Sequence, residues 1–190
     1  MPPVTPPAAK SAESHPSPDN PSPAVTKFIT QEARRLSGID PDPEATRRRL
    51  NAWAREVDAR GSQDLGAVVL DEDRDQDERF LAAFLLGLVP DDHAVEVLRK
   101  VALEPFHGRP MGEKHGDRLR AIEVQVRAAA IEGLARHRQS VEARTALETA
   151  AKAHEDQFLS DRAQRALHEW RTGERVEEQD RKALGKALTR

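Results

Sequence analysis

The chain has 190 residues, which is enough for one domain of ordinary size and a tail. Tyrosine is absent and aromatic residues make up only 4%, which disfavours strands, whereas good helix formers such as alanine, leucine, arginine and glutamate dominate. The formal net charge of −3 excludes a general attraction to nucleic acid or anionic lipid, and the lack of cysteine excludes disulfides and thiolate metal sites. The composition therefore favours an all-α fold.

Residues 1–23 are predicted to form a disordered, extended arm. This segment holds eight of the 13 prolines and almost no large apolar side chains. It cannot bury enough surface to offset the entropy lost on ordering. Docking of the prolines at its start onto a proline-binding module is conceivable, but a simple spacer is favoured.

From Val25 onward, apolar residues recur at helical spacing. The first helix ends before Gly38, and the second, opened by Pro41 and Pro43, is expected to end at Gly61. Further helices are predicted, in chain order, over 63–70, 78–89, 92–103, 119–136, 140–154, 157–171 and 174–188.

These helices carry a weak internal repeat, in which a basic residue is followed by a small or apolar residue three positions later and an apolar one seven positions later. The frame fits Arg79-Ala82-Leu86 and Arg127-Ala130-Leu134, and more loosely Arg47-Leu50-Ala54 and Ser160-Ala163-Leu167. The frames start 32, 48 and 33 residues apart, and the long interval equals one repeat plus 15 residues. Because residues 104–118 are rich in glycine and proline and have that length, we interpret them as a loop inserted into a repeat of helical pairs.

Two of the copies carry the pattern of a known repeat family. The pattern is an acidic turn followed by arginine, alanine and then leucine-glycine. Leu70 to Asp73 is the acidic turn, and Glu78 to Gly87 contains the residues that follow it. The segment Val126 to Leu134 is similar to Glu78 to Gly87. Over about residues 44–188 the pattern resembles the short bacterial HEAT-like repeats, which also occur in phycobilin lyases. The resemblance implies a right-handed α-solenoid of about four helical pairs, in a domain spanning 24–190. It also implies that the second helices of successive pairs line a concave binding face.

The expected binding residues follow from that register. On the second helices, the positions opposite the apolar stripe carry mixed charges and are Glu96, Arg99, Lys100, Arg144, Glu148 and Lys152. The inserted loop adds residue types that are favoured in binding loops and interfaces, namely Phe106, His107, Arg109 and Met111. Mixed charge suits a protein or peptide partner better than a polyanion. We therefore expect a non-catalytic scaffold or adaptor that binds such a partner on the concave face.

Metal and cofactor sites are not expected. The residues Asp71 to Asp77 alternate like the start of a calcium loop, but Gln76 and Ala82 occupy the sixth and twelfth positions, where glycine and a bidentate acid are needed. Acidic residues before a helix complement its dipole, which explains the run better. A metal site on His107 and His115 would lack a third ligand on a rigid support.

Two other functions remain open. Arg34-Arg35 and Arg47-Arg48-Arg49 would form a nucleic-acid-binding surface if they converged, although nearby acids dilute them. A lyase-like enzyme would require an apolar pocket ringed by polar groups. No glycine-rich phosphate loop, nucleophile elbow or His-Glu-x-x-His helix is present to support an enzyme.

The expected location is the cytoplasm. No stretch of the sequence approaches the roughly 20 apolar residues of a membrane-spanning helix. The N-terminus also lacks the basic-then-apolar layout of a secretory signal. The alternative is an exported or membrane-tethered fragment that has lost its signal or anchor.

Overall fold

The computed structural model describes residues 21–36, 42–106 and 114–173. Every regular element in these ranges is an α-helix, which confirms the all-α prediction for this part of the chain. The helices are α1 (Pro23–Leu36), α2 (Pro43–Glu56), α3 (Ala59–Leu70), α4 (Gln76–Leu86), α5 (Asp92–Leu103), α6 (Lys114–Arg136), α7 (Val141–Ala153) and α8 (Gln157–Thr172). The predicted arm, apart from residues 21–23, and the predicted helix over 174–188 lie outside the described residues. Within the described ranges, none of the helices has the length and apolar character to cross a bilayer.

Most of the helices begin at a side chain that caps them. The N-cap residues of α2, α3, α4, α5, α7 and α8 accept hydrogen bonds from backbone N–H groups of the first turn, and they are Asp42, Asp58, Asp75, Asp91, Ser140 and Asp156. In the acidic run before α4, Asp75 caps the helix and an Asp71 carboxylate oxygen accepts from the backbone of Asp73 at 3.2 Å. Asp75 thus has the helix-start role that the structural explanation expects, whereas Asp71, the C-cap of α3, accepts from an amide of the turn.

The boundary between α2 and α3 corrects the sequence prediction. The chain leaves the helical conformation at Val57, and α3 starts at Ala59. Gly61, which was predicted to end a helix, lies inside α3, where its N–H donates to the Asp58 carboxylate at 2.8 Å. A strong N-cap aspartate therefore decides the boundary, four residues earlier than the predicted start of this helix at 63.

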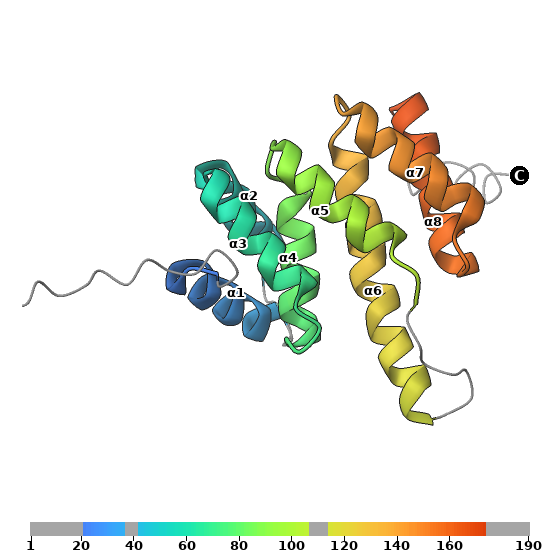
Figure 1. Cartoon of the computed structure of the whole chain (residues 1–190). Coiled ribbons are helices and arrows are strands. Elements are labelled where there is room, and N and C mark those ends of the chain that lie inside the picture. The colour runs from blue at the N-terminus through green and yellow to red at the C-terminus, as the bar shows by residue number, and fades with distance from the viewer. Residues whose placement is uncertain (1–20, 37–41, 107–113, 174–190) are drawn as a thin grey trace, which may run out of the picture.

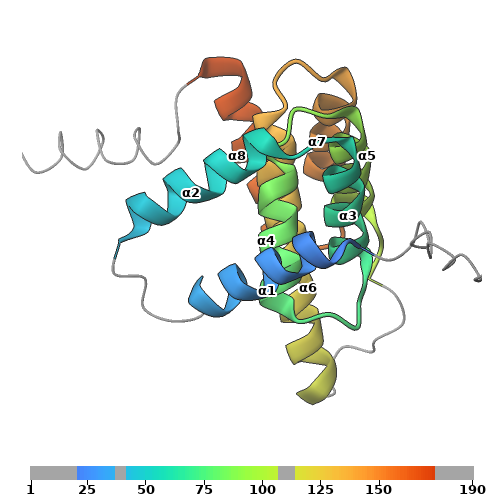
Figure 2. The ribbon, with the colours of Figure 1, turned by 90° about the vertical axis from the view of Figure 1, so that its left-hand side faces the viewer.

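The helices from α3 to α8 form three stacked hairpins, α3/α4, α5/α6 and α7/α8, in two layers. Each hairpin packs tightly within itself, α3 contacts α5 and α5 contacts α7, and in the second layer α4 contacts α6 and α6 contacts α8. Figure 2 looks along the stack and shows α3, α5 and α7 on one side, with α4, α6 and α8 beside them. The core between the layers is built mainly of leucine, valine and alanine.

Each hairpin closes with the same cross-link, at the first position of the repeat frame. Arg79 of α4 donates from Nε to the carbonyl of Val69 at 3.1 Å, at the end of α3. The Arg127 guanidinium of α6 donates to the carbonyls of Glu104 and Pro105, just after α5. Ser160 of α8 donates to the carbonyl of Ala151 at 2.8 Å, near the end of α7. These buried donors satisfy carbonyls that a helix end leaves without partners.

The small residues of the frame let the layers approach closely. Ala82, Ala130 and Ala163 are each fully buried, as expected for close-packed positions of the frame. A Cβ atom added to Gly87 would lie 2.5 Å from the Cα of Gly133, so α4 and α6 touch backbone to backbone there. Glycine is required at Gly87 because any larger side chain would push the two helices apart.

The first two helices do not make a fourth pair of this kind in the described structure. Both α1 and α2 pack on α4, and α1 also contacts α3, so together they cover one end of the stack (Figure 1). They meet each other mainly through the stacked rings of Phe28 and Trp53, whose centroids lie 4.3 Å apart, and the Arg49–Glu32 ion pair at 2.6 Å. Arg47, at the frame position of α2, is exposed.

Candidate functional site

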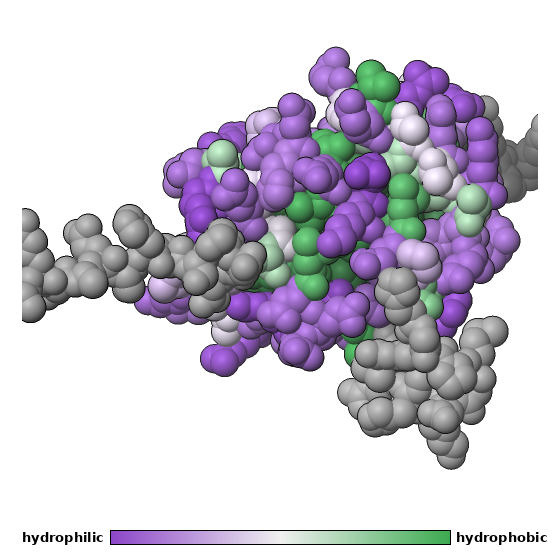
Figure 3. Space-filling model, in the orientation of Figure 1, coloured by the Kyte–Doolittle hydropathy of each residue, from purple (hydrophilic) through white to green (hydrophobic). Residues whose placement is uncertain are grey.

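A groove lies between α5 and α7 on the described stack. Its volume is about 610 Å³, and we call it the α5/α7 groove. It is lined by Asp92, Val95, Glu96, Arg99, Leu103, Ser140, Val141, Glu142, Thr145, Ala146 and Thr149. The groove opens on the layer of α3, α5 and α7, the face turned toward the viewer in Figures 1 and 3.

The walls of the α5/α7 groove are more apolar than the residue types suggest. The hydroxyl of Thr145 donates to the carbonyl of Val141, and that of Thr149 donates to the carbonyl of Thr145, both at 2.9 Å. Because these donors are used within α7, the two threonines offer the groove mainly hydrocarbon. Val141 is 72% exposed, an unusually open position for a valine. Figure 3 shows apolar surface along the middle of this face, surrounded by hydrophilic side chains.

The rim of the groove is charged. Asp92, Glu96 and Glu142 contribute three carboxylates, and Arg99 contributes one guanidinium. The hydroxyl of Ser140 is already engaged, since it accepts from the backbone of Ala143 and donates to Glu142, both at 3.1 Å. The rim can therefore form ion pairs, but its serine serves as a helix cap rather than as a nucleophile.

A second, smaller groove lies on the other side of α5. It has a volume of about 410 Å³ and is lined by Leu70, His93, Glu96, Val97, Arg99, Lys100, Leu103 and Glu104. A third hollow, of about 310 Å³, lies between the α4–α5 and α6–α7 turns and shares Asp92, Val95 and Ser140 with the α5/α7 groove. The exposed face of α5 is thus bordered by hollows on both sides and at its N-terminal end.

The predicted charged residues fall into two groups. Glu96, Arg99 and Lys100 are exposed on α5 and line the grooves beside it. The other three, Arg144, Glu148 and Lys152, lie on α7 but outside the linings of all three hollows. Arg144 and Glu148 pair with each other at 3.1 Å. The structure therefore brings the α5 residues to a candidate site and leaves the α7 residues beside it.

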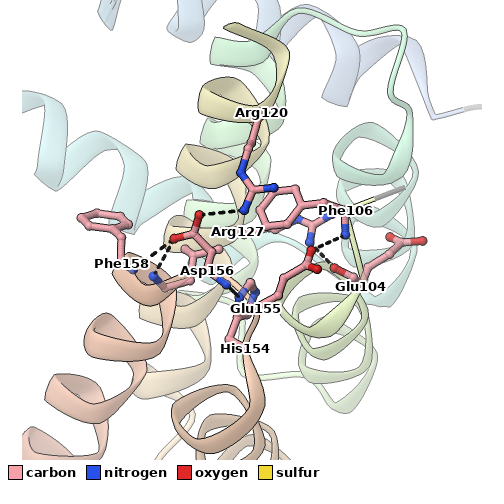
Figure 4. A network of polar contacts seen from close by, with 9 residues as sticks. Glu104, Phe106, Arg120, Arg127, His154, Glu155, Asp156 and Phe158 are labelled. Carbon is pink, nitrogen blue, oxygen red and sulfur yellow. Dashed lines mark hydrogen bonds and ion pairs between the residues drawn. The ribbon is translucent and has the colours of Figure 1, made fainter. Parts of the chain in front are cut away.

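Phe106, predicted to contact a partner, makes several contacts within the fold. Its ring is partly buried against the core, with the Arg127 and Arg120 guanidinium groups 3.9 and 4.3 Å from its centroid (Figure 4). Its backbone N–H donates to the Glu155 carboxylate at 2.9 Å, and its ring meets His154 edge-on with centroids 6.0 Å apart. These contacts fasten the segment after α5 to α6 and to the α7–α8 turn.

The other predicted loop residues, His107, Arg109 and Met111, lie outside the described residues. The predicted extent of the loop was too long, however, because α6 begins at Lys114, and residues 114–118 belong to that helix. A single glycine such as Gly116 costs a long helix only about 1 kcal/mol, which the rest of the 23-residue helix tolerates.

Two histidines in the turns are kept neutral by their surroundings. Burial lowers the pKa of His154, and the nearby positive charge of Arg127 lowers it further. Its Nδ1 accepts a hydrogen bond from the backbone of Asp156 at 3.0 Å, which requires an unprotonated nitrogen. Burial also lowers the pKa of His137, whose Nε2 donates to the carbonyl of Leu86 at 3.1 Å. The hydrogen bonds of both rings therefore hold the turns in place, which is a structural role.

Sequence reasoning missed the α7 side of the groove. Val141, Glu142, Thr145 and Thr149 line it, yet none was predicted. The available signal was Val141, an apolar residue directly after a predicted helix start and off the buried stripe of Ala143, Ala146 and Leu147. No group of three or more histidine, aspartate or glutamate side chains in the described residues is arranged to hold a metal ion.

Comparison with known proteins adds no further guide to the site. No protein-family model, curated protein or solved structure matched the chain.

Proposed function

We propose that this protein is a non-catalytic scaffold, a right-handed α-solenoid of the HEAT-like kind, which binds a protein or peptide partner on the layer formed by α3, α5 and α7. The observation that carries the proposal is the α5/α7 groove of about 610 Å³, with hydrocarbon walls and a charged rim. An apolar centre bordered by polar groups is the usual anatomy of a protein–protein interface.

The repeated cross-link supports the solenoid part of the proposal. Arg79, Arg127 and Ser160 make equivalent contacts in three successive hairpins. Two-layer stacking of such hairpins leaves one row of helices with an extended outer surface, on which neighbouring helices form parallel grooves. Solenoids generally use surfaces of this type to bind extended partners.

The proposal is tested by site-specific photo-crosslinking of the full chain in cells that produce it. Benzoylphenylalanine would replace Thr149, in the groove wall, and in a control protein Arg165, an exposed residue of α8 in the other layer. Both positions are exposed and helical, so neither substitution removes a core side chain. We expect a discrete protein adduct from Thr149 and none from Arg165. Equal adducts from both positions, or no adduct from Thr149, would count against the proposal.

A second candidate function rests on the arginines of α1 and α2. The Arg49–Glu32 ion pair holds the last turns of α1 beside the first half of α2. The four exposed arginines near this pair, Arg34, Arg35, Arg47 and Arg48, therefore lie within about one helical turn of it, and none makes an ion pair within the described residues. This arrangement would suit a phosphate backbone. A steep salt dependence of nucleic-acid binding that is lost in an Arg35→Ala/Arg48→Ala variant would favour this function.

A further inference from the structure

We propose that the occupant of the α5/α7 groove is a cationic amphipathic helix of the partner protein. This inference rests on the proposed function and names the partner's chemistry. Three features of the groove carry it: the saturated backbone of its walls, its length, and a charge that sets it apart from the two hollows beside it.

The walls favour a helical occupant. Both α5 and α7 use their backbone groups in their own hydrogen bonds, so the groove has no free strand edge to which an extended peptide could add. An extended peptide pressed into the apolar walls would leave its own N–H and C=O groups buried without partners. A helix satisfies those groups internally and needs only to bury an apolar stripe.

The dimensions suit a short helical segment. The groove follows α5, which has 12 residues, so its length is about 18 Å. A helix of about three turns fills that length and presents apolar residues at positions i, i+3, i+4 and i+7. Those side chains would meet Val95, Leu103 and Val141 and the hydrocarbon of the two threonines.

Charge distinguishes the α5/α7 groove from its neighbours. Its rim holds three carboxylates against one guanidinium. The groove between α3 and α5 balances Glu96 and Glu104 against Arg99 and Lys100. The hollow at the turns balances two aspartates against two arginines, namely Asp91, Asp92, Arg136 and Arg138. Only the α5/α7 groove of these three is acidic, so lysine or arginine beside the apolar stripe of the occupant complements it.

Glu96 is the residue on which this charge preference chiefly depends. Asp92 and Glu142 lie in the first turns of α5 and α7, where the positive ends of the helix dipoles offset part of their charge. Glu96 lies beyond the first turn of α5. It is highly exposed, and its carboxylate lies 3.9 Å from the imidazole Nδ1 of His93, which carries a charge only when protonated. Its carboxylate is thus the one most available to a cation on a bound helix.

The experiment uses two labelled synthetic helices of about 14 residues and the full chain. Both peptides carry leucine at i, i+3, i+4 and i+7, and one has lysine where the other has glutamate on the flanking positions. Binding is measured by fluorescence anisotropy for the parent protein, for Glu96→Lys and for Glu72→Lys. Glu72 is an exposed residue of the α3–α4 turn outside all three hollows, so its variant makes the same change in net charge.

We expect the lysine peptide to bind at least about tenfold more tightly than the glutamate peptide. Glu96→Lys should weaken binding of the lysine peptide by at least about fivefold, while Glu72→Lys changes it by less than about twofold. Equal binding of the two peptides, no binding of the lysine peptide, or equal effects of the two variants overturns the inference. Cross-linking of a native partner at Thr149 without binding of the lysine peptide overturns this inference alone, whereas failure of cross-linking overturns the proposed function.

Discussion

The hairpins from α3 to α8 and the two helices before them have similar apolar spacing, yet they are held together differently. In the hairpins, α4, α6 and α8 each send a buried donor from the same frame position to the end of the helix before them. The helices α5 and α7, which the sequence register expected to be the second of their pairs, are therefore the first helices of their hairpins. In α2 the frame residue Arg47 is exposed, and the bond to α1 comes from Arg49, two positions later. Leu50 and Ala54 nevertheless fit the frame and are buried.

The difference shows that apolar spacing and repeat geometry are separate properties of this sequence. Apolar residues at helical spacing suffice to bury one face of a helix, as in α2. The buried donor additionally fixes how far one helix slides along its neighbour, because it must reach a particular carbonyl. We infer that α3 to α8 form the cooperative unit and that α2 is an attachment at its end.

The largest expected effect comes from removing a frame arginine in the stack. Arg79 is buried and pairs with both carboxylate oxygens of Glu123, so Arg79→Met leaves that carboxylate and the Val69 carbonyl without their donor. We expect a loss of about 3 kcal/mol in the free energy of unfolding, measured with urea. The matched change Arg47→Met, at the exposed frame position of α2, should cost less than about 0.5 kcal/mol. Similar losses of unfolding free energy for both variants would contradict the claim that the frame residue stabilises the hairpins but not α2.

A smaller loss is expected from overpacking the same frame. Ala130 is fully buried between the layers, so Ala130→Leu should cost about 1–3 kcal/mol. Ala52 is an exposed alanine of α2, so Ala52→Leu should stay within about 0.5 kcal/mol of the parent. Urea unfolding measures both, and an Ala130→Leu variant as stable as the parent would show that the repeat register is wrong.

Acid should loosen the stack through its turn histidines. Burial lowers the pKa of His137 and of His154 in the folded state below the ordinary value of 6.5. The unfolded chain therefore takes up protons first as the pH falls, so the contribution of each neutral ring to stability is complete above about pH 6.5 and declines below it. We expect the urea midpoint to fall from pH 7.5 to pH 5.5, and to fall less in a His137→Gln/His154→Gln variant. An identical pH dependence in parent and variant would contradict this assignment.

The smallest effect is expected at the N-terminus. Residues 1–23 are predicted from the sequence to form a disordered arm, but α1 begins at Pro23, and the carbonyl of Ser22 accepts a hydrogen bond from the backbone N–H of Thr26 at 3.0 Å. The matching deletion is therefore 1–20, which should shift the melting temperature by no more than about 2 °C. A larger drop would mean that the deleted segment packs on the folded part.

The sequence predicted the regular helices well because their ends carry local signals. The bounds of α5 match the prediction, and those of α7 and α8 differ from it by one residue at most, since Asp91, Ser140 and Asp156 cap them. Two local signals conflicted at the start of α3, because Asp58 favours a helix start and Gly61 favours a helix end. The helix starts after Asp58 and continues through Gly61. The start of α6 was missed because helix continues through Gly116.

The candidate site was only partly predictable. The sequence of a single helix is enough to identify the positions opposite its apolar stripe. On α5 these positions, Glu96, Arg99 and Lys100, are indeed exposed. The groove depends on which side of α7 faces α5, a tertiary relation that no single-helix pattern contains. The role of Phe106 likewise depends on Arg120 and Arg127, which approach it from α6.

Native-state hydrogen exchange on the full chain tests the cooperative unit most directly. We expect the amides of α4 and α6, the helices through which the first two hairpins pack on each other, to exchange slowest and through a common opening with α3, α5 and α7. We expect the amides of α2 to exchange faster, through a separate opening that leaves the hairpins folded. Exchange of α2 at the same rate as α4 and α6, through one global opening, would contradict the inference that α3 to α8 form a separate cooperative unit.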